Sequence, residues 1–149
     1  MRERILALKK GWVITGFGIS QVLPVIVNGF MSPVNSITLV EQPEVHLHPR
    51  MQAKLADLFV DIVKSGNVNG QASRQYIVET HSEYFLNRLR ALIATKKIDS
   101  TFVKIYSVEE AGQQGSTINN LAISPNGSFL WPRHFMATDL DNTLLFLEN

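Results

Sequence analysis

The chain has 149 residues, 45% hydrophobic and 18% charged, and its 14 Lys and Arg against 13 Asp and Glu leave a formal net charge of +1. This length and composition fit one globular domain and argue against disorder. The sequence has no apolar run near the ~20 residues that cross a bilayer. The lack of cysteine excludes disulfides and thiolate metal sites and suits a reducing compartment, so we expect a soluble cytoplasmic protein, without an overall charge that favours nucleic acid.

The first 41 residues predict a loop, a helix and a strand. A glycine-containing loop at 15–18 precedes the apolar stretch 22–27, where Ser20 can cap a helix and Pro24 then lies in the first turn. Residues 36–41 form a short, β-branched apolar run that ends in a carboxylate. Such a run is typical of a strand buried on both faces.

Two amphipathic helices and a second strand follow. Apolar residues at i, i+3, i+4 and i+7 spacing predict a helix over 50–64, which begins at Pro49, and another over 82–97. Between them, residues 75–79 predict a strand. A strand–helix–strand order of this length gives a parallel pair with a right-handed crossover.

The last third of the chain predicts two more strands, over 102–108 and 117–123, joined by a polar loop at 109–115. Residues 125–127 predict a turn, and 131–149 a helix or an irregular cap. The fold class is therefore α/β, with a mainly parallel sheet, flanking helices and a terminal strand pair.

Polar side chains follow both predicted parallel strands. In parallel α/β sheets, ligands bind beyond the carboxyl ends of the strands. A strand that ends in a carboxylate can hold Mg²⁺, because this hard cation takes oxygen ligands. The residues expected along this one edge of the sheet are Glu41, Gln42, Glu44, His46, His48, Thr80 and His81.

Each motif also has a purely structural interpretation. The two acids after the first strand could be surface residues, and the H-x-H pair could merely flank a buried Leu47. Thr80 and Glu83 have the spacing of a capping box. Gly16 and Gly18 could form only a turn.

The order of these motifs carries a resemblance. Residues 37–49 resemble the Walker B strand and D-loop of ABC-type ATPases, in particular the SMC, RecF and OLD-nuclease-like group often labelled AAA. Residues 78–82 (VETHS) resemble the switch strand, whose histidine senses the terminal phosphate, and residues 16–24 (GFGISQVLP) resemble the variant signature segment. Together, GFGISQVLP, EQPEVHLHP and ETHS resemble a family of bacterial ATPases.

The resemblance implies the C-terminal lobe of a P-loop NTPase fold, that is, a partial ATPase domain over residues 1–149. Its parts would be the signature segment at 14–30, the Walker B strand and D-loop at 36–49, the switch strand at 75–82 and a C-terminal extension at 100–149.

Carried over by position, the resemblance implies four catalytic roles. Glu41 would organise Mg²⁺, and Gln42 stands where many ABC ATPases have the carboxylate that polarises the attacking water. Glu44 is the nearest alternative carboxylate, and His81 would contact the terminal phosphate or the attacking water.

The resemblance also implies contacts across a dimer interface. The D-loop histidines, His46 and His48, would cross that interface. A phosphate held by the opposite subunit would meet donors at a helix start, contributed by Gly16, Gly18, Ser20 and Gln21.

Three departures from the family pattern bear on activity. Glu41 replaces the usual aspartate and is one methylene longer, and Gln42 cannot act as a base. If no other carboxylate serves, hydrolysis would be slow and ATP would act more as a clamp. The phosphate-binding pattern G-x-x-x-x-G-K-[ST] does not occur in the sequence. We therefore expect the later part of a longer ATPase, inactive alone, with exposed apolar edges and a tendency to associate.

The expected ligand is ATP with Mg²⁺, and the expected partners are a second copy or the missing N-terminal lobe, without a membrane. DNA stays open through scattered basic side chains, whose ordinary interpretation is a solvated face: Arg74, Arg88, Arg90, Lys96, Lys97 and Lys104.

Two other functions remain open. An H-x-H pair, here His46 and His48 together with His81 and Glu41, also occurs in metal-dependent hydrolases, because both imidazoles can turn toward one ion. The only further histidine ligand would be His134, far along the chain. The other alternative is a non-catalytic module that dimerises with an intact ATPase and blocks its composite site.

Overall fold

The computed structural model describes residues 18–33, 35–65, 74–112, 115–132 and 135. The chain divides into two units, Met1–Phe85 and Leu86–Asn149. Expectations for residues 1–17 and most of 133–149 lie outside the described residues. No helix of the described part is long and apolar enough to cross a membrane.

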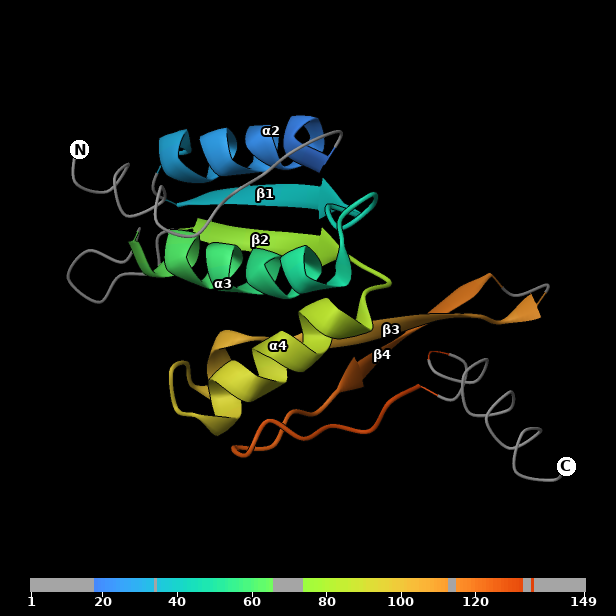
Figure 1. Cartoon of the computed structure of the whole chain (residues 1–149). Coiled ribbons are helices and arrows are strands. Elements are labelled where there is room, and N and C mark those ends of the chain that lie inside the picture. The colour runs from blue at the N-terminus through green and yellow to red at the C-terminus, as the bar shows by residue number, and fades with distance from the viewer. Residues whose placement is uncertain (1–17, 34, 66–73, 113–114, 133–134, 136–149) are drawn as a thin grey trace, which may run out of the picture. The chain divides into compact units, whose positions relative to one another are not determined.

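The elements of the chain alternate between helix and strand up to the boundary between the units (Figure 1). In chain order they are α2 (Gly18–Met31), β1 (Ser36–Glu41), α3 (Pro49–Ser65), β2 (Arg74–Glu79), α4 (Glu83–Ala94), the 3₁₀ helix η1 (Ser100–Phe102), β3 (Ile105–Glu110) and β4 (Ser116–Leu121). The α/β class, the parallel pair and the terminal strand pair are confirmed.

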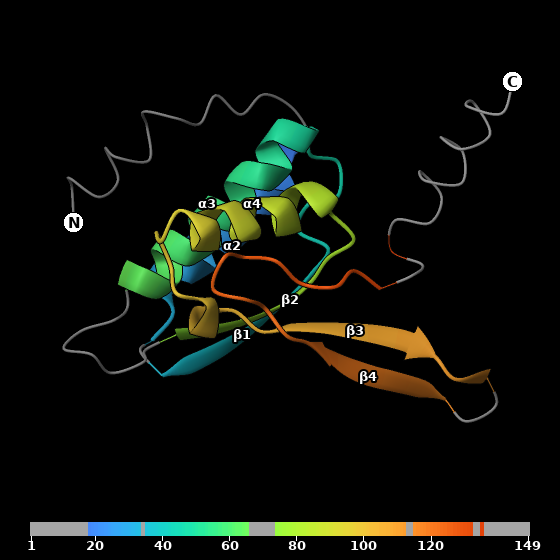
Figure 2. The same cartoon turned by 90° about the horizontal axis from the view of Figure 1, so that it is seen from below.

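The parallel pair consists of β1 and β2, in register from Ser36 opposite Arg74 to Glu41 opposite Glu79. Thr38 and Tyr76 are neighbours on one face of this sheet. The Thr38 hydroxyl donates to Asn28 of α2, and the Tyr76 ring lies edge-on to Phe59 of α3, at 5.2 Å between centroids. Both helices therefore cover the same face, as Figure 2 shows from below.

The opposite face of the same sheet is exposed. Ile37, Leu39 and Ile77 point to this side and are 60%, 74% and 58% exposed. The expectation that residues 36–41 are buried on both faces is wrong, because exposure alternates along β1 and the described helices cover only one face. The exposed apolar side chains thus lie on a face of the sheet.

The core of the first unit is built mainly by α3, where the predicted amphipathic helix is confirmed. Its buried side chains are Leu55, Ala56, Leu58, Phe59, Val60 and Ile62. Helix α2 approaches α3 closely at Gly29, where a Cβ atom would collide with the Ile62 side chain. Phe59 also packs edge-on against Phe85, at 5.8 Å between ring centroids.

Helix α2 begins at Gly18, earlier than the sequence predicts. Ser20 therefore lies in the first turn and is not the cap, and Pro24 lies inside the helix. A proline there has no N–H for the carbonyl four residues earlier. The helix nevertheless continues to Met31, consistent with the nearly complete burial of Val22, which is 1% exposed.

The second unit contains an antiparallel hairpin and a capped turn. β3 and β4 pair from Ile105 opposite Leu121 to Glu110 opposite Ser116. The expectation of a strand starting at residue 102 is wrong, because Phe102 ends the 3₁₀ helix η1. The Asp99 carboxylate caps that helix by accepting a 2.8 Å hydrogen bond from the Thr101 backbone N–H.

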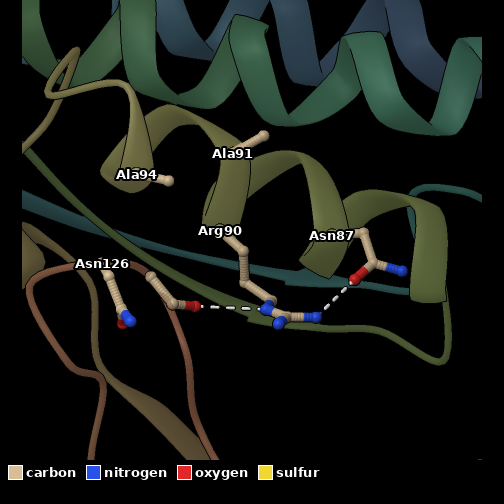
Figure 3. A pocket seen from close by; sticks show the side chains of 6 residues that line it. Asn87, Arg90, Ala91, Ala94 and Asn126 are labelled. Atoms are coloured by element: carbon tan, nitrogen blue, oxygen red, sulfur yellow. Dashed lines mark hydrogen bonds between the residues drawn. The ribbon is translucent and has the colours of Figure 1, made fainter.

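The predicted turn at 125–127 is confirmed and holds a cluster around Arg90. Arg90 Nε donates to the Gly127 carbonyl at 3.1 Å and Nη1 donates to Asn87 Oδ1 at 2.9 Å, beside a shallow hollow (Figure 3). The guanidinium also lies over the rings of Phe129 and Trp131, 5.6 and 5.7 Å from their centroids. The interpretation of Arg90 as a solvated side chain is therefore wrong.

Arg74, another of the scattered basic residues, also forms a hydrogen bond within the protein. It is part-buried, and its Nε donates a 3.0 Å hydrogen bond to the Ser32 carbonyl. Two of the six basic side chains that could have contacted DNA thus hold the protein's own backbone.

Candidate functional site

Two polar loops leave the sheet from the same edge. β1 and β2 end at Glu41 and Glu79, which lie opposite each other, and the loops at 42–48 and 80–82 follow. The Gln42 backbone N–H donates to the Glu79 carbonyl at 2.9 Å, so the first loop begins against the end of the second strand. The structure places the seven polar residues expected at this edge within these two loops and the last residue of β1.

Glu44 joins the two loops. Its side chain is buried, with 6% of its surface exposed. Oε1 accepts two hydrogen bonds of 2.8 Å, one from the Thr80 hydroxyl and one from the His81 backbone N–H. Oε2 is also buried and has no hydrogen-bond partner. The buried Glu44 side chain therefore holds the loop that carries His81.

Further hydrogen bonds continue from Glu44 and close a ring through five residues, which we call the loop ring. The Glu44 carbonyl accepts from Leu47 N–H at 3.0 Å, and the Leu47 carbonyl accepts from Gln52 Nε2 at 2.9 Å. Gln52 Oε1 accepts from the Ser82 hydroxyl at 2.6 Å. The Ser82 N–H donates to Thr80 Oγ1 at 3.1 Å, which returns to Glu44.

Sequence reasoning missed Gln52 and Ser82 as members of this site. Gln52 lies in the first turn of α3, on the helix end next to the first loop. Ser82 immediately precedes α4, and its Oγ accepts from Phe85 N–H at 3.1 Å, as an N-cap does. A serine directly before an amphipathic helix is typical of a helix N-cap, and this pattern could have identified Ser82.

The predicted capping box between Thr80 and Glu83 is wrong, because Ser82 and not Thr80 caps α4. Ser82 contacts the free N–H of the first turn of α4, and the Thr80 hydroxyl donates to Glu44. Thr80 therefore belongs to the link between the loops.

The side chains with potential chemistry are exposed around this buried link. Glu41, Gln42, His46, His48 and His81 are all exposed. Gln42 and His46 have positive backbone φ angles, 42° and 63°. Each such conformation costs a non-glycine residue about 1–2 kcal/mol, so the contacts of the loop maintain a shape that its residues do not favour.

His48 has a structural role at the start of α3. Its Nδ1 accepts from the Arg50 N–H at 3.3 Å, and its carbonyl accepts from Met51 N–H at 2.7 Å, so it caps the start of α3. Leu47, between the two histidines, is only half-buried.

The signature-like segment is described in part. Gly16 lies outside the described residues, Gly18 begins α2, and Ser20 and Gln21 are exposed in its first turn. A short connection joins the end of α2 to the start of β1, so the two run in opposite directions (Figure 1). The start of α2 therefore lies toward the sheet end from which the two loops leave.

The predicted histidine set does not form a metal centre in the described part of the chain. No three His, Asp or Glu side chains gather there in a way that could hold a metal ion. The structure does place a carboxylate that sequence reasoning missed, Glu79, beside Glu41 at the same strand position. Both strands end in glutamate, which was the signal.

Comparison with known proteins gives a result for one part of the chain. No curated protein and no solved structure matches it significantly. Residues 14–86 match the family model of the AAA ATPase domain, a range that contains α2, β1, α3, β2 and both loops. The segment that carries the candidate site is therefore similar to the ATPase domains of the AAA family, whose members act on ATP.

Proposed function

We propose that residues 36–82 form the magnesium-organising and phosphate-sensing side of an ATP-hydrolysing site. The observation that carries the proposal is the hydrogen-bonded link from Glu44 to Thr80 and His81, which joins an acidic strand end to a histidine loop. The family match over residues 14–86 supports the same conclusion.

The exposed side chains suit the roles that the resemblance implies. Glu41 offers carboxylate oxygens at the end of β1, and Glu79 adds a second negative charge opposite it. Oxygen ligands and negative charge favour Mg²⁺, which neutralises charge on a bound triphosphate. His81 presents an exposed imidazole from a backbone that Glu44 holds in place, so it can contact the terminal phosphate.

The burial of Glu44 supports one of two roles for this carboxylate. A general base has to reach the attacking water, whereas the Glu44 residue is buried, its Oε2 atom is buried, and its Oε1 atom already accepts two hydrogen bonds. We therefore assign Glu44 to support of the site. Because Gln42 cannot accept a proton as a base, these loops favour slow hydrolysis and a clamp-like use of ATP.

The other side of the site has to come from a phosphate-binding loop, whose pattern the sequence lacks. We propose that a lobe carrying such a loop meets the D-loop histidines His46 and His48 and the helix start at Ser20 and Gln21. ATP alone then binds this chain weakly and is not measurably hydrolysed.

Titration of the ¹⁵N-labelled chain with Mg·ATP tests the proposal. We expect amide shifts at 41–48 and 79–82, with a dissociation constant in the millimolar range, and smaller shifts without Mg²⁺. Glu41→Ala should reduce the amide shifts. Gln75→Ala, which changes a residue of β2 on the same exposed face of the sheet, should not. Micromolar binding by the chain alone, or shifts confined to residues after 86, would contradict the proposal.

A further inference from the structure

The loop ring connects the residues that flank the exposed histidines. Thr80 and Ser82 stand on either side of His81, and both are ring members. Leu47 stands between His46 and His48, and both its N–H and its carbonyl are used in the ring. The backbone next to all three imidazoles is thus tied to one hydrogen-bonded circuit, while the imidazoles themselves are exposed.

Gln52 and Ser82 make the half of this circuit that does not pass through Glu44. Ser82 is 5% exposed and uses its hydroxyl twice, as acceptor from Phe85 N–H and as donor to Gln52 Oε1. A helix cap needs only the acceptor. Gln52 in turn uses its oxygen toward Ser82 and its amide nitrogen toward the Leu47 carbonyl, so it spans the two loops from α3.

We propose that Gln52 and Ser82 are positioning residues that hold His81 in register with the loop at 42–48. A displacement of His81 on contact with a phosphate would then reach Leu47 and the neighbouring His46 and His48 through two routes, Glu44 and Gln52. This inference rests on the proposed function only for the identity of the ligand; the positioning itself belongs to the free chain.

Amide hydrogen exchange of the ligand-free chain tests the positioning. Gln52→Leu removes both side-chain hydrogen bonds of Gln52, and neither of these bonds involves His81 or the bond from the His81 N–H. We expect the protection of the His81 amide to fall by about fivefold relative to that of Leu58 in the core of α3, roughly the weight of one net hydrogen bond. Gln75→Leu, which replaces a glutamine on the exposed face of β2, serves as the matched control and should leave the ratio unchanged.

A second pair of variants separates positioning from simple damage to the fold. Thr80→Val removes the hydroxyl that donates to Glu44, whereas Thr80→Ser retains it. Protection of the His81 and Leu47 amides should fall in the valine variant and be restored in the serine variant. Unchanged His81 protection in Gln52→Leu, or equal losses across all amides, would overturn the proposal.

Mg·ATP added to the same samples distinguishes failure of this inference from failure of the proposed function. Wild-type protein should show shifts at both 46–48 and 79–82, and Gln52→Leu should retain those at 79–82 and reduce those at 46–48, because the route through Glu44 remains. If ATP shifts no amide while the exchange results hold, the proposed ligand is wrong and the positioning stands.

Discussion

The two units of the chain each surround a charged side chain with their own backbone, but they use it differently. In the first unit, the buried Glu44 links two loops, leaves Oε2 without a partner, and has exposed histidines around it. In the second unit, Arg90 donates hydrogen bonds to the Gly127 carbonyl and to Asn87 and lies over two aromatic rings. The difference is that the buried carboxyl group of the first unit holds a loop with an exposed histidine, whereas the guanidinium of the second unit holds a turn and packs against rings. The family match ends at residue 86, where the second unit begins.

The largest effect should come from the core of the first unit. Leu55→Ala removes a fully buried side chain of α3 and should lower the free energy of unfolding by about 3 kcal/mol. Hydrogen exchange at β1 and β2 and denaturant unfolding measure the loss. We expect amides of β3 and β4 to keep their protection; equal losses in both units would break the comparison.

The corresponding substitution in the second unit is Gly127→Ala. Gly127 has a φ of +78°, and an added Cβ would collide with the Arg90 backbone carbonyl, so we expect a loss of about 2 kcal/mol. Gly112→Ala is the matched control, because Gly112 has a φ of +60° with open space around it and should cost less. Unfolding in denaturant, followed by circular dichroism, measures the cost of both substitutions. Equal costs for the two variants would mean that the Arg90 cluster does not constrain the turn.

The smallest effects concern two aspartates, Asp61 in the first unit and Asp99 in the second, whose contributions to stability should depend on pH in opposite ways. Burial, with a further contribution from Asp57, raises the pKa of Asp61 in α3 above 3.8. The folded state then binds the proton more tightly, so the charged form destabilises the fold as pH rises from 3.8. Asp61→Asn should stabilise the first unit at pH 7 by a few tenths of a kcal/mol, as for a like-charge helix pair. The gain should vanish below pH 3.8.

Asp99 in the second unit should behave in the opposite way. Hydrogen bonds from the Thr101 hydroxyl and N–H lower its pKa below 3.8, so its contribution to stability is present above 3.8 and is lost as pH falls through the lowered value. Asp99→Ala should therefore destabilise the protein at pH 7 and approach wild type in acid. Thermal unfolding between pH 2.5 and 7 measures both variants, and slopes of the same sign would refute the contrast.

The sequence predicted those features that depend on local pattern. The strand at 36–41 and the helix starting at Pro49 have the expected bounds to within a residue, because β-branched runs and helical spacing act over short distances. The edge at which the acids and histidines gather followed from parallel pairing. The strand start at 102 was wrong because a single side chain, Asp99, turns the chain into η1.

The loop ring could not be predicted in the same way. Glu44 meets Thr80 from 36 residues away, and Gln52 meets Ser82 from 30 residues away. These contacts depend on the register of two strands and on side-chain rotamers that no short pattern specifies. The burial of Glu44 in particular, on which its proposed supporting role rests, is a property of these long-range contacts.

A closed ring of hydrogen bonds differs from an open chain in having two paths between any two of its members. Loss of one bond leaves the second path intact, so a single substitution at Gln52 or at Thr80 should be tolerated better than the two together. The effect of a mutation at one of these positions then depends on what already occupies the other. Over a series of mutations, the first change in the ring should therefore cost less than the second.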